Sequence, residues 1–172
     1  MKVYKINKFT YTVDFPVIFL FFGVSLDVIS TFIFVTLDAG REMHPILGKL
    51  ISTSIWFIPI YLFITNALFI PFLSRILRKT LSYTIGLSGF LFSLNNFSLV
   101  IFRNAFLVDK IGYTPIIITF LLLGFILFLY NLKLNKLTSE SIKETLFELF
   151  YFIIVISLLN SLFLTITFLP IN

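Results

Sequence analysis

The chain has 172 residues, of which 59% are hydrophobic and only 12% are charged, and its net charge is +5. Ordinary soluble domains carry roughly 25% charged residues, and a fold of this size cannot hide so much apolar surface from water. The composition therefore excludes a soluble globular domain and predicts a protein that meets lipid.

Apolar segments recur along the chain at the length needed to cross a bilayer. About 20 consecutive apolar residues span the hydrocarbon core as a helix, which satisfies its own backbone hydrogen bonds. Five segments qualify, so we predict an all-α, polytopic transmembrane helix bundle of the cell membrane with five spans, forming one domain over residues 1–172. The predicted spans are about 15–37, 50–74, 80–102, 111–132 and 149–171.

The basic residues lie between these spans and orient the chain. Nine of the 13 fall on one side: Lys2, Lys5, Lys8, Arg75, Arg78, Lys79, Lys133, Lys136 and Lys143. The other side holds Arg41, Lys49, Arg103 and Lys110. The positive-inside rule then predicts a cytoplasmic N-terminus and an outside C-terminus. Scattered basic residues of this kind favour contact with membrane lipids and not with nucleic acid.

Asp27 lies near the middle of the first predicted span. A carboxylate at that depth costs roughly 2.5–3.5 kcal/mol on the insertion scale, so it should face protein or water. Gly23, Asp27 and Thr31 follow i, i+4, i+8 spacing and, with Ser30, form a small polar stripe expected to face the bundle interior. Two interpretations stay open: a site for a proton, an ion or a ligand, and a structural hydrogen bond between helices.

The third predicted span carries small and polar residues within a narrow arc. They are Ser82, Gly86, Gly89, Ser93 and Asn96. Small residues let another helix approach closely, and Asn96 is placed to hydrogen-bond across to a neighbouring span. Asn66 and Asn160, in the second and fifth spans, are interpreted as ordinary contacts between helices. In the connection before the fifth span, Ser141 and Glu144 have capping-box spacing, which predicts a helix start there.

The connection after the first span holds Glu42 and His44, the single histidine of the chain. A Glu-x-His pair offers two metal ligands, and Asp27 is the candidate for a third, provided that the connection dips into the membrane. The alternative is a cluster that caps and turns the chain. With no cysteine and one histidine, the chain cannot supply thiolate sites or bis-histidine haem ligation, and no cofactor is predicted.

Several of these motifs resemble an uncharacterised family of small prokaryotic membrane proteins, catalogued as a domain of unknown function. The resemblance covers roughly residues 15–106 and is carried by Leu26–Thr31, Gly40–Leu47, Trp56, Phe97–Val100 and Asn104. The family's pattern is Asp-x-x-x-Thr in the first helix, Gly-x-Glu-x-Asn-Pro in the loop and a Trp in the second helix. This sequence has His44 in place of the Asn, lacks a lysine in the second span, and continues beyond the family's three-helix unit. The resemblance implies a fold and a set of marked residues, but no activity.

Three functional hypotheses follow, in order of preference. The first is a non-enzymatic structural or accessory subunit that packs against a protein partner in a larger complex or against a second copy, since no complete catalytic set is present. The second is a small ion- or proton-coupled transporter that uses Asp27. The third is an intramembrane metal-dependent hydrolase that uses Asp27, Glu42 and His44. The functional candidates are Asp27, Thr31, Glu42, His44, Asn96 and Asn104.

Overall fold

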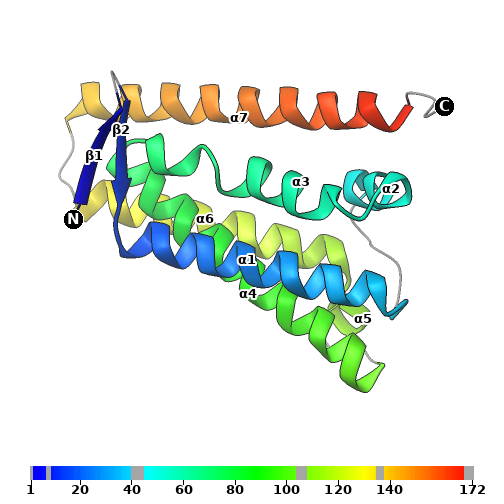
Figure 1. Ribbon diagram of the computed structural model, residues 1–172. Coiled ribbons are helices and arrows are strands. Elements are labelled where there is room, and N and C mark those ends of the chain that lie inside the picture. The colour runs from blue at the N-terminus through cyan, green and yellow to red at the C-terminus, as the bar shows by residue number, and fades with distance from the viewer. Residues whose placement is uncertain (1, 7–8, 40–44, 104–107, 135–137, 169–172) are drawn as a thin grey trace.

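Long helices make up most of the fold. A computed structural model describes residues 2–6, 9–39, 45–103, 108–134 and 138–168. Within these ranges, four helices are long and apolar enough to cross a membrane (Figure 1). They are α1 (Phe15–Thr36), α4 (Arg75–Phe102), α6 (Tyr113–Leu134) and α7 (Ser139–Phe168). The first, third, fourth and fifth predicted segments are therefore confirmed as helices.

The second predicted span is not one continuous helix. It is divided among α2 (Pro45–Thr53), α3 (Phe57–Asn66) and the 3₁₀ turn η1 (Ile70–Phe72). Pro59 has no N–H to donate to the Ile55 carbonyl, which accepts instead from the Ile58 N–H at 3.1 Å. Pro71 likewise lies in η1. In Figure 1, α2 and α3 nevertheless follow one another along the bundle between α1 and α7.

A β-hairpin precedes α1, which the all-α prediction did not include. Strands β1 (Lys2–Ile6) and β2 (Phe9–Val13) pair antiparallel, with Tyr4 opposite Tyr11. Both strands are rich in β-branched and aromatic residues, which favour extended structure. The hairpin leads through Asp14 into α1, where the Asp14 carboxylate accepts from the Val17 N–H at 3.3 Å and so caps the helix.

The closest helix packing in the molecule joins α1 to α4 through glycine. A Cβ on Gly23 would overlap the backbone carbonyl of Gly86, and one on Gly89 would lie 2.6 Å from the Gly23 carbonyl oxygen. Ser82 and Ser93, on the same arc of α4, are also buried. The small residues predicted to admit a neighbouring helix therefore do so, and the neighbour is α1 of the same chain.

A buried ion pair ties the beginning of α1 to the beginning of α4. Arg78 is 7% exposed, and its guanidinium lies 3.4 Å from the Asp14 carboxylate while it also donates to the Leu73 carbonyl at 3.0 Å. Each of the two charged groups therefore has more than one hydrogen-bond partner, which offsets the cost of burying it.

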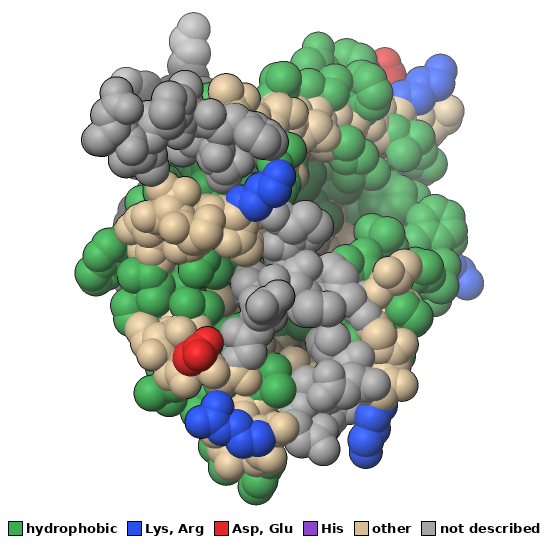
Figure 2. All heavy atoms as spheres, turned by 90° about the vertical axis from the view of Figure 1, so that its right-hand side faces the viewer, with side chains coloured by type: hydrophobic (Ala, Val, Ile, Leu, Met, Phe, Trp, Pro, Cys, Tyr) green, Lys and Arg blue, Asp and Glu red, His purple; other side chains and the backbone are tan. Residues whose placement is uncertain are grey.

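Helix α7 lies at the edge of the bundle. Its start is capped by Thr138, whose hydroxyl oxygen accepts from the Ser141 N–H at 3.3 Å, so the helix begins slightly before the predicted Ser141. Glu148 accepts from the Ser74 N–H at 2.7 Å and links α7 to the start of α4. Only 6% of the most apolar stretch of α7 is buried. Figure 2, which views the bundle from the end where α4 finishes, shows hydrophobic side chains along its flanks, a surface suited to acyl chains.

Candidate functional site

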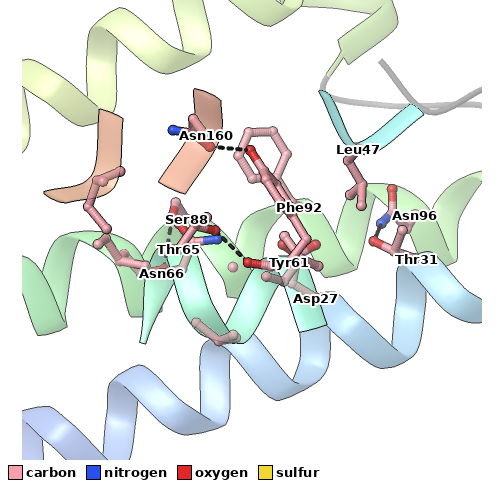
Figure 3. A pocket seen from close by; sticks show the side chains of 15 residues that line it. Asp27, Thr31, Leu47, Tyr61, Thr65, Asn66, Ser88, Phe92, Asn96 and Asn160 are labelled. Atoms are coloured by element: carbon pink, nitrogen blue, oxygen red, sulfur yellow. Dashed lines mark hydrogen bonds between the residues drawn. The ribbon is translucent and has the colours of Figure 1, made fainter. Parts of the chain in front are cut away.

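A cavity of about 260 Å³ lies inside the bundle, between α1, α3, α4 and α7 (Figure 3). Apolar side chains form part of its wall, but carboxyl, hydroxyl and amide groups from all four helices reach it. The polar lining is Asp27 and Thr31 from α1, Tyr61, Thr65 and Asn66 from α3, Ser88 and Asn96 from α4, and Asn160 from α7. Such a concentration of polar groups inside a bundle of apolar helices makes this the candidate functional site.

Asp27 and Thr31 reach the cavity because they lie one turn apart on the face of α1 that packs against α4. Asp27 is partly buried, and Thr31 is 2% exposed. Asn96 crosses from α4 and donates its amide hydrogens to the Ser30 hydroxyl at 3.2 Å and to the Thr31 hydroxyl at 3.1 Å. Three of the predicted site residues therefore line one cavity, and the expected hydrogen bond from Asn96 across to the first helix is present.

The opposite wall comes from α3 and α7. The Tyr61 hydroxyl donates to the Asn160 side-chain oxygen at 2.9 Å (Figure 3). The Tyr61 ring also packs edge-on against Phe163, with ring centroids 5.1 Å apart. These two contacts fasten the otherwise exposed α7 to the broken second segment and close this side of the cavity.

Several hydroxyl groups in or beside the wall donate their hydrogens to other protein groups. Thr65 donates to the Tyr61 carbonyl at 2.7 Å, and Ser88 donates to the Ile85 carbonyl at 2.8 Å. Ser30, beside the cavity, donates to the Asp27 carbonyl at 3.0 Å. A hydroxyl has one hydrogen and two lone pairs, so each of these groups keeps accepting capacity.

Charged side chains are scarce among the described residues of the wall. Among the described lining residues, Asp27 is the single carboxylate and no Lys, Arg or His is present. In the part of the chain that the structure describes, three or more His, Asp or Glu side chains nowhere gather as a metal site would require. Glu42, His44 and Asn104 lie outside the described residues, so the metal and loop hypotheses that involve them stay predictions.

Three of the eight polar residues in this wall, Asp27, Thr31 and Asn96, were predicted as site residues from the sequence. Tyr61, Thr65 and Ser88 were not singled out. Asn66 and Asn160 were interpreted as ordinary contacts between helices, and Asn160 does make such a contact, with Tyr61. One signal was available: Tyr61 lies inside an apolar segment, away from the membrane interface where tyrosine usually anchors a span. Thr65 follows it by one helical turn, which places both on one face.

Comparison with protein-family models, curated proteins and solved structures found no match for this chain. The fold and the site therefore define it at the level of class, as a helical protein with several helices long and apolar enough to cross a membrane around a polar cavity.

Proposed function

We propose that this protein is a multi-pass carrier of the cell membrane that binds a small polar solute in the central cavity, with Asp27 as the main binding group. The observation that carries the proposal is the gathering of polar side chains from four helices around one cavity of about 260 Å³. Polar groups are costly inside a membrane, and those that face a cavity typically mark a substrate or ion pathway.

The arrangement of the segments supports five crossings. In Figure 1, α1, the α2–α3 segment, α4, α6 and α7 run back and forth along the bundle, and the two termini lie at opposite ends. The basic residues Arg75, Lys79 and Lys143 belong to helix starts at the same end as the start of α1. Together with the positive-inside rule, this favours a cytoplasmic N-terminus and an outside C-terminus.

The broken second segment supports transport as well. Membrane carriers commonly form their binding sites from discontinuous helices, whose free ends supply backbone groups to the solute. Here α3 ends at Asn66, and Asn66 itself lines the cavity. The interruption therefore lies where a solute-binding role needs it.

Uptake by proteoliposomes tests this function. We expect the purified protein to admit at least one of four radiolabelled probes, namely sodium, rubidium, ethanolamine and alanine, faster than protein-free liposomes do. Asp27→Asn should lower that uptake about tenfold or more, because hydrogen bonds to a charged group are worth roughly 1.5–3 kcal/mol.

Asp38→Asn is the matched control, because Asp38 is exposed beyond the end of α1 and asparagine tolerates its positive φ of 48°. This variant should transport as the natural chain does. Uptake of none of the four probes above the protein-free rate, or full uptake by Asp27→Asn, would reject the carrier.

The accessory-subunit hypothesis makes the opposite forecast for Asp27→Asn, namely that the substitution is tolerated, and it requires a co-purifying partner. A face of small residues could serve such a partner, but here it is occupied by packing of α1 against α4 within the chain, as the Gly23–Gly86 contact indicates. The cavity is our reason for preferring a carrier.

A further inference from the structure

We infer that the solute held in the cavity is a small organic ammonium cation, bound through its N–H groups by oxygen atoms of the wall. This inference rests on the proposed solute-binding role of the cavity and adds the chemical class of the ligand. Its basis is the direction of the hydrogen bonds in the wall, together with charge, size and the character of the remaining lining.

Hydrogen-bond direction makes the wall rich in acceptors. The hydroxyl hydrogens of Thr65, Ser88 and Tyr61 are donated to protein oxygens, so these groups can offer a ligand only lone pairs. Asn96 donates its amide hydrogens to Ser30 and Thr31, so its side-chain carbonyl oxygen is the atom that can accept a hydrogen bond from a ligand. A lining with this many acceptors favours a ligand that is rich in donors.

Two amide groups, of Asn66 and Asn160, add donors on the side formed by α3 and α7. They suit an acceptor on the body of the ligand, such as a hydroxyl group. The acceptors come from α1, α3 and α4, whereas the amide donors come from α3 and α7, so acceptors surround more of the cavity than donors do.

Charge points the same way. The described lining contains the carboxylate of Asp27 and no Lys, Arg or His, a composition that favours a cation over an anion. The C-terminal end of α3 reaches the wall at Asn66, and a helix C-terminus carries partial negative charge that favours a cation.

Size and shape favour an organic cation over a bare metal ion. A water molecule takes up about 30 Å³ in the liquid, and an apolar cavity of about 150 Å³ accommodates benzene. A cavity of about 260 Å³ therefore has room for several heavier atoms around one ammonium group. The rings of Tyr61 and Phe92, with aliphatic neighbours such as Val24 and Ile85, supply an apolar surface and aromatic faces that attract cations.

Binding to the full-length protein in lipid nanodiscs tests the inference. The nanodiscs contain phosphatidylcholine, whose headgroup has no N–H, and calorimetric titration uses propylammonium, tetramethylammonium, sodium and propionate as probes. We expect saturable binding of propylammonium, at least about tenfold tighter than that of each other probe, because only propylammonium combines positive charge with N–H donors.

Two variants report on the site. Asp27→Asn should weaken propylammonium binding about tenfold or more. Ser88→Ala removes one acceptor from the wall and should weaken it by a smaller factor, whereas Asp38→Asn should leave it unchanged. Preferential binding of propionate, equal binding of all four probes, or no saturable binding of propylammonium would overturn the inference.

The ammonium group can belong to a free amine or to the headgroup of a lipid, and a second membrane separates the two. In nanodiscs that contain phosphatidylethanolamine, equal affinity for propylammonium assigns a free amine, whereas weaker apparent affinity assigns the headgroup; both support an ammonium site. Binding of propylammonium without uptake of any probe would reject the carrier function but support an ammonium ligand. Uptake of a probe without propylammonium binding would support the carrier function but reject an ammonium ligand.

Discussion

Asn96 shows how one side chain can join two helices and shape a cavity at once. Its amide hydrogens bridge Ser30 and Thr31 on α1, and its position one to two turns beyond Gly89 keeps it on the packed face of α4. These two hydrogen bonds set the orientation of the Asn96 amide. The contact that joins α1 to α4 therefore also leaves the side-chain oxygen of Asn96 as its hydrogen-bond acceptor.

A double-mutant cycle measures this bridge. Asn96→Ala should lower the free energy of unfolding by about 0.6 kcal/mol, the average for hydrogen bonds between transmembrane helices, and by no more than about 1.7 kcal/mol. Combining it with the Ser30→Ala, Thr31→Val pair should add less than the sum of the two separate losses, because both changes remove the same bonds. Unfolding in mixed micelles, followed by circular dichroism, provides the measurement. Strict additivity would mean that the bridge does not form.

At the level of single residues, the sequence predicted part of the site for a physical reason. Asp27, Thr31 and Asn96 stand out because polar groups inside apolar spans are expensive, and the structure brings them to one cavity. Ser88 did not stand out, because serine is common in transmembrane helices, and the position of Tyr61 inside a span was a signal that does not by itself point to a cavity. Their contribution depends on which face each helix turns inward, and packing against other segments decides that.

Among the elements, the α1–α4 pair is held by backbone contact at glycine. We predict that Gly23→Ala lowers the free energy of unfolding by about 1–3 kcal/mol, the usual cost of overpacking, because the obstructing atoms belong to the Gly86 backbone and cannot turn aside. Thermal or detergent unfolding of the two proteins measures the difference.

Gly124→Ala on α6 is the matched control. Its added Cβ would lie 3.3 Å from the Thr84 side chain, which needs to move by only a few tenths of an ångström, and alanine favours a helix over glycine. This variant should be as stable as the natural chain. Equal loss of stability in both variants would contradict a special contact at Gly23.

The elements that sequence predicted well are those for which hydrophobicity alone decides the outcome. The predicted 15–37 corresponds to α1, Phe15–Thr36, and the predicted 111–132 to α6, Tyr113–Leu134. The segment at 50–74 has the same hydrophobicity, but Pro59 and Pro71 interrupt its backbone hydrogen bonds, a local effect that an average over the segment hides. The β1–β2 hairpin was not predicted from the sequence. Its lysines were interpreted as charges on the cytoplasmic side, whereas its β-branched and aromatic residues favour strands.

For the whole molecule, the five-crossing topology is open to a direct test, because a chain without cysteine can carry one introduced cysteine without background. Lys110→Cys and Ser139→Cys each place an exposed thiol next to the start of a long helix, at opposite ends of the bundle. In intact cells, an impermeant maleimide should label the first and spare the second, as expected for an N-terminus in the cytoplasm.

Permeabilised cells are the control, because both thiols should react there. Labelling of Ser139→Cys alone in intact cells would invert the topology. Labelling of both, or of neither, in intact cells would remove the alternation on which the five crossings rest.

The unequal fastening of the helices has a mechanical consequence. The glycine contact and the Asp14–Arg78 ion pair join α1 and α4 tightly, whereas the bonds that join α7 to its neighbours include Tyr61–Asn160 and Glu148–Ser74. In a carrier built this way, α1 and α4 would stay together while α7 moves, pivoting at Glu148 and separating from α3 at Asn160. A solute that enters from the side would have to break the Tyr61–Asn160 hydrogen bond, so solute binding would be coupled to a displacement of the whole of α7.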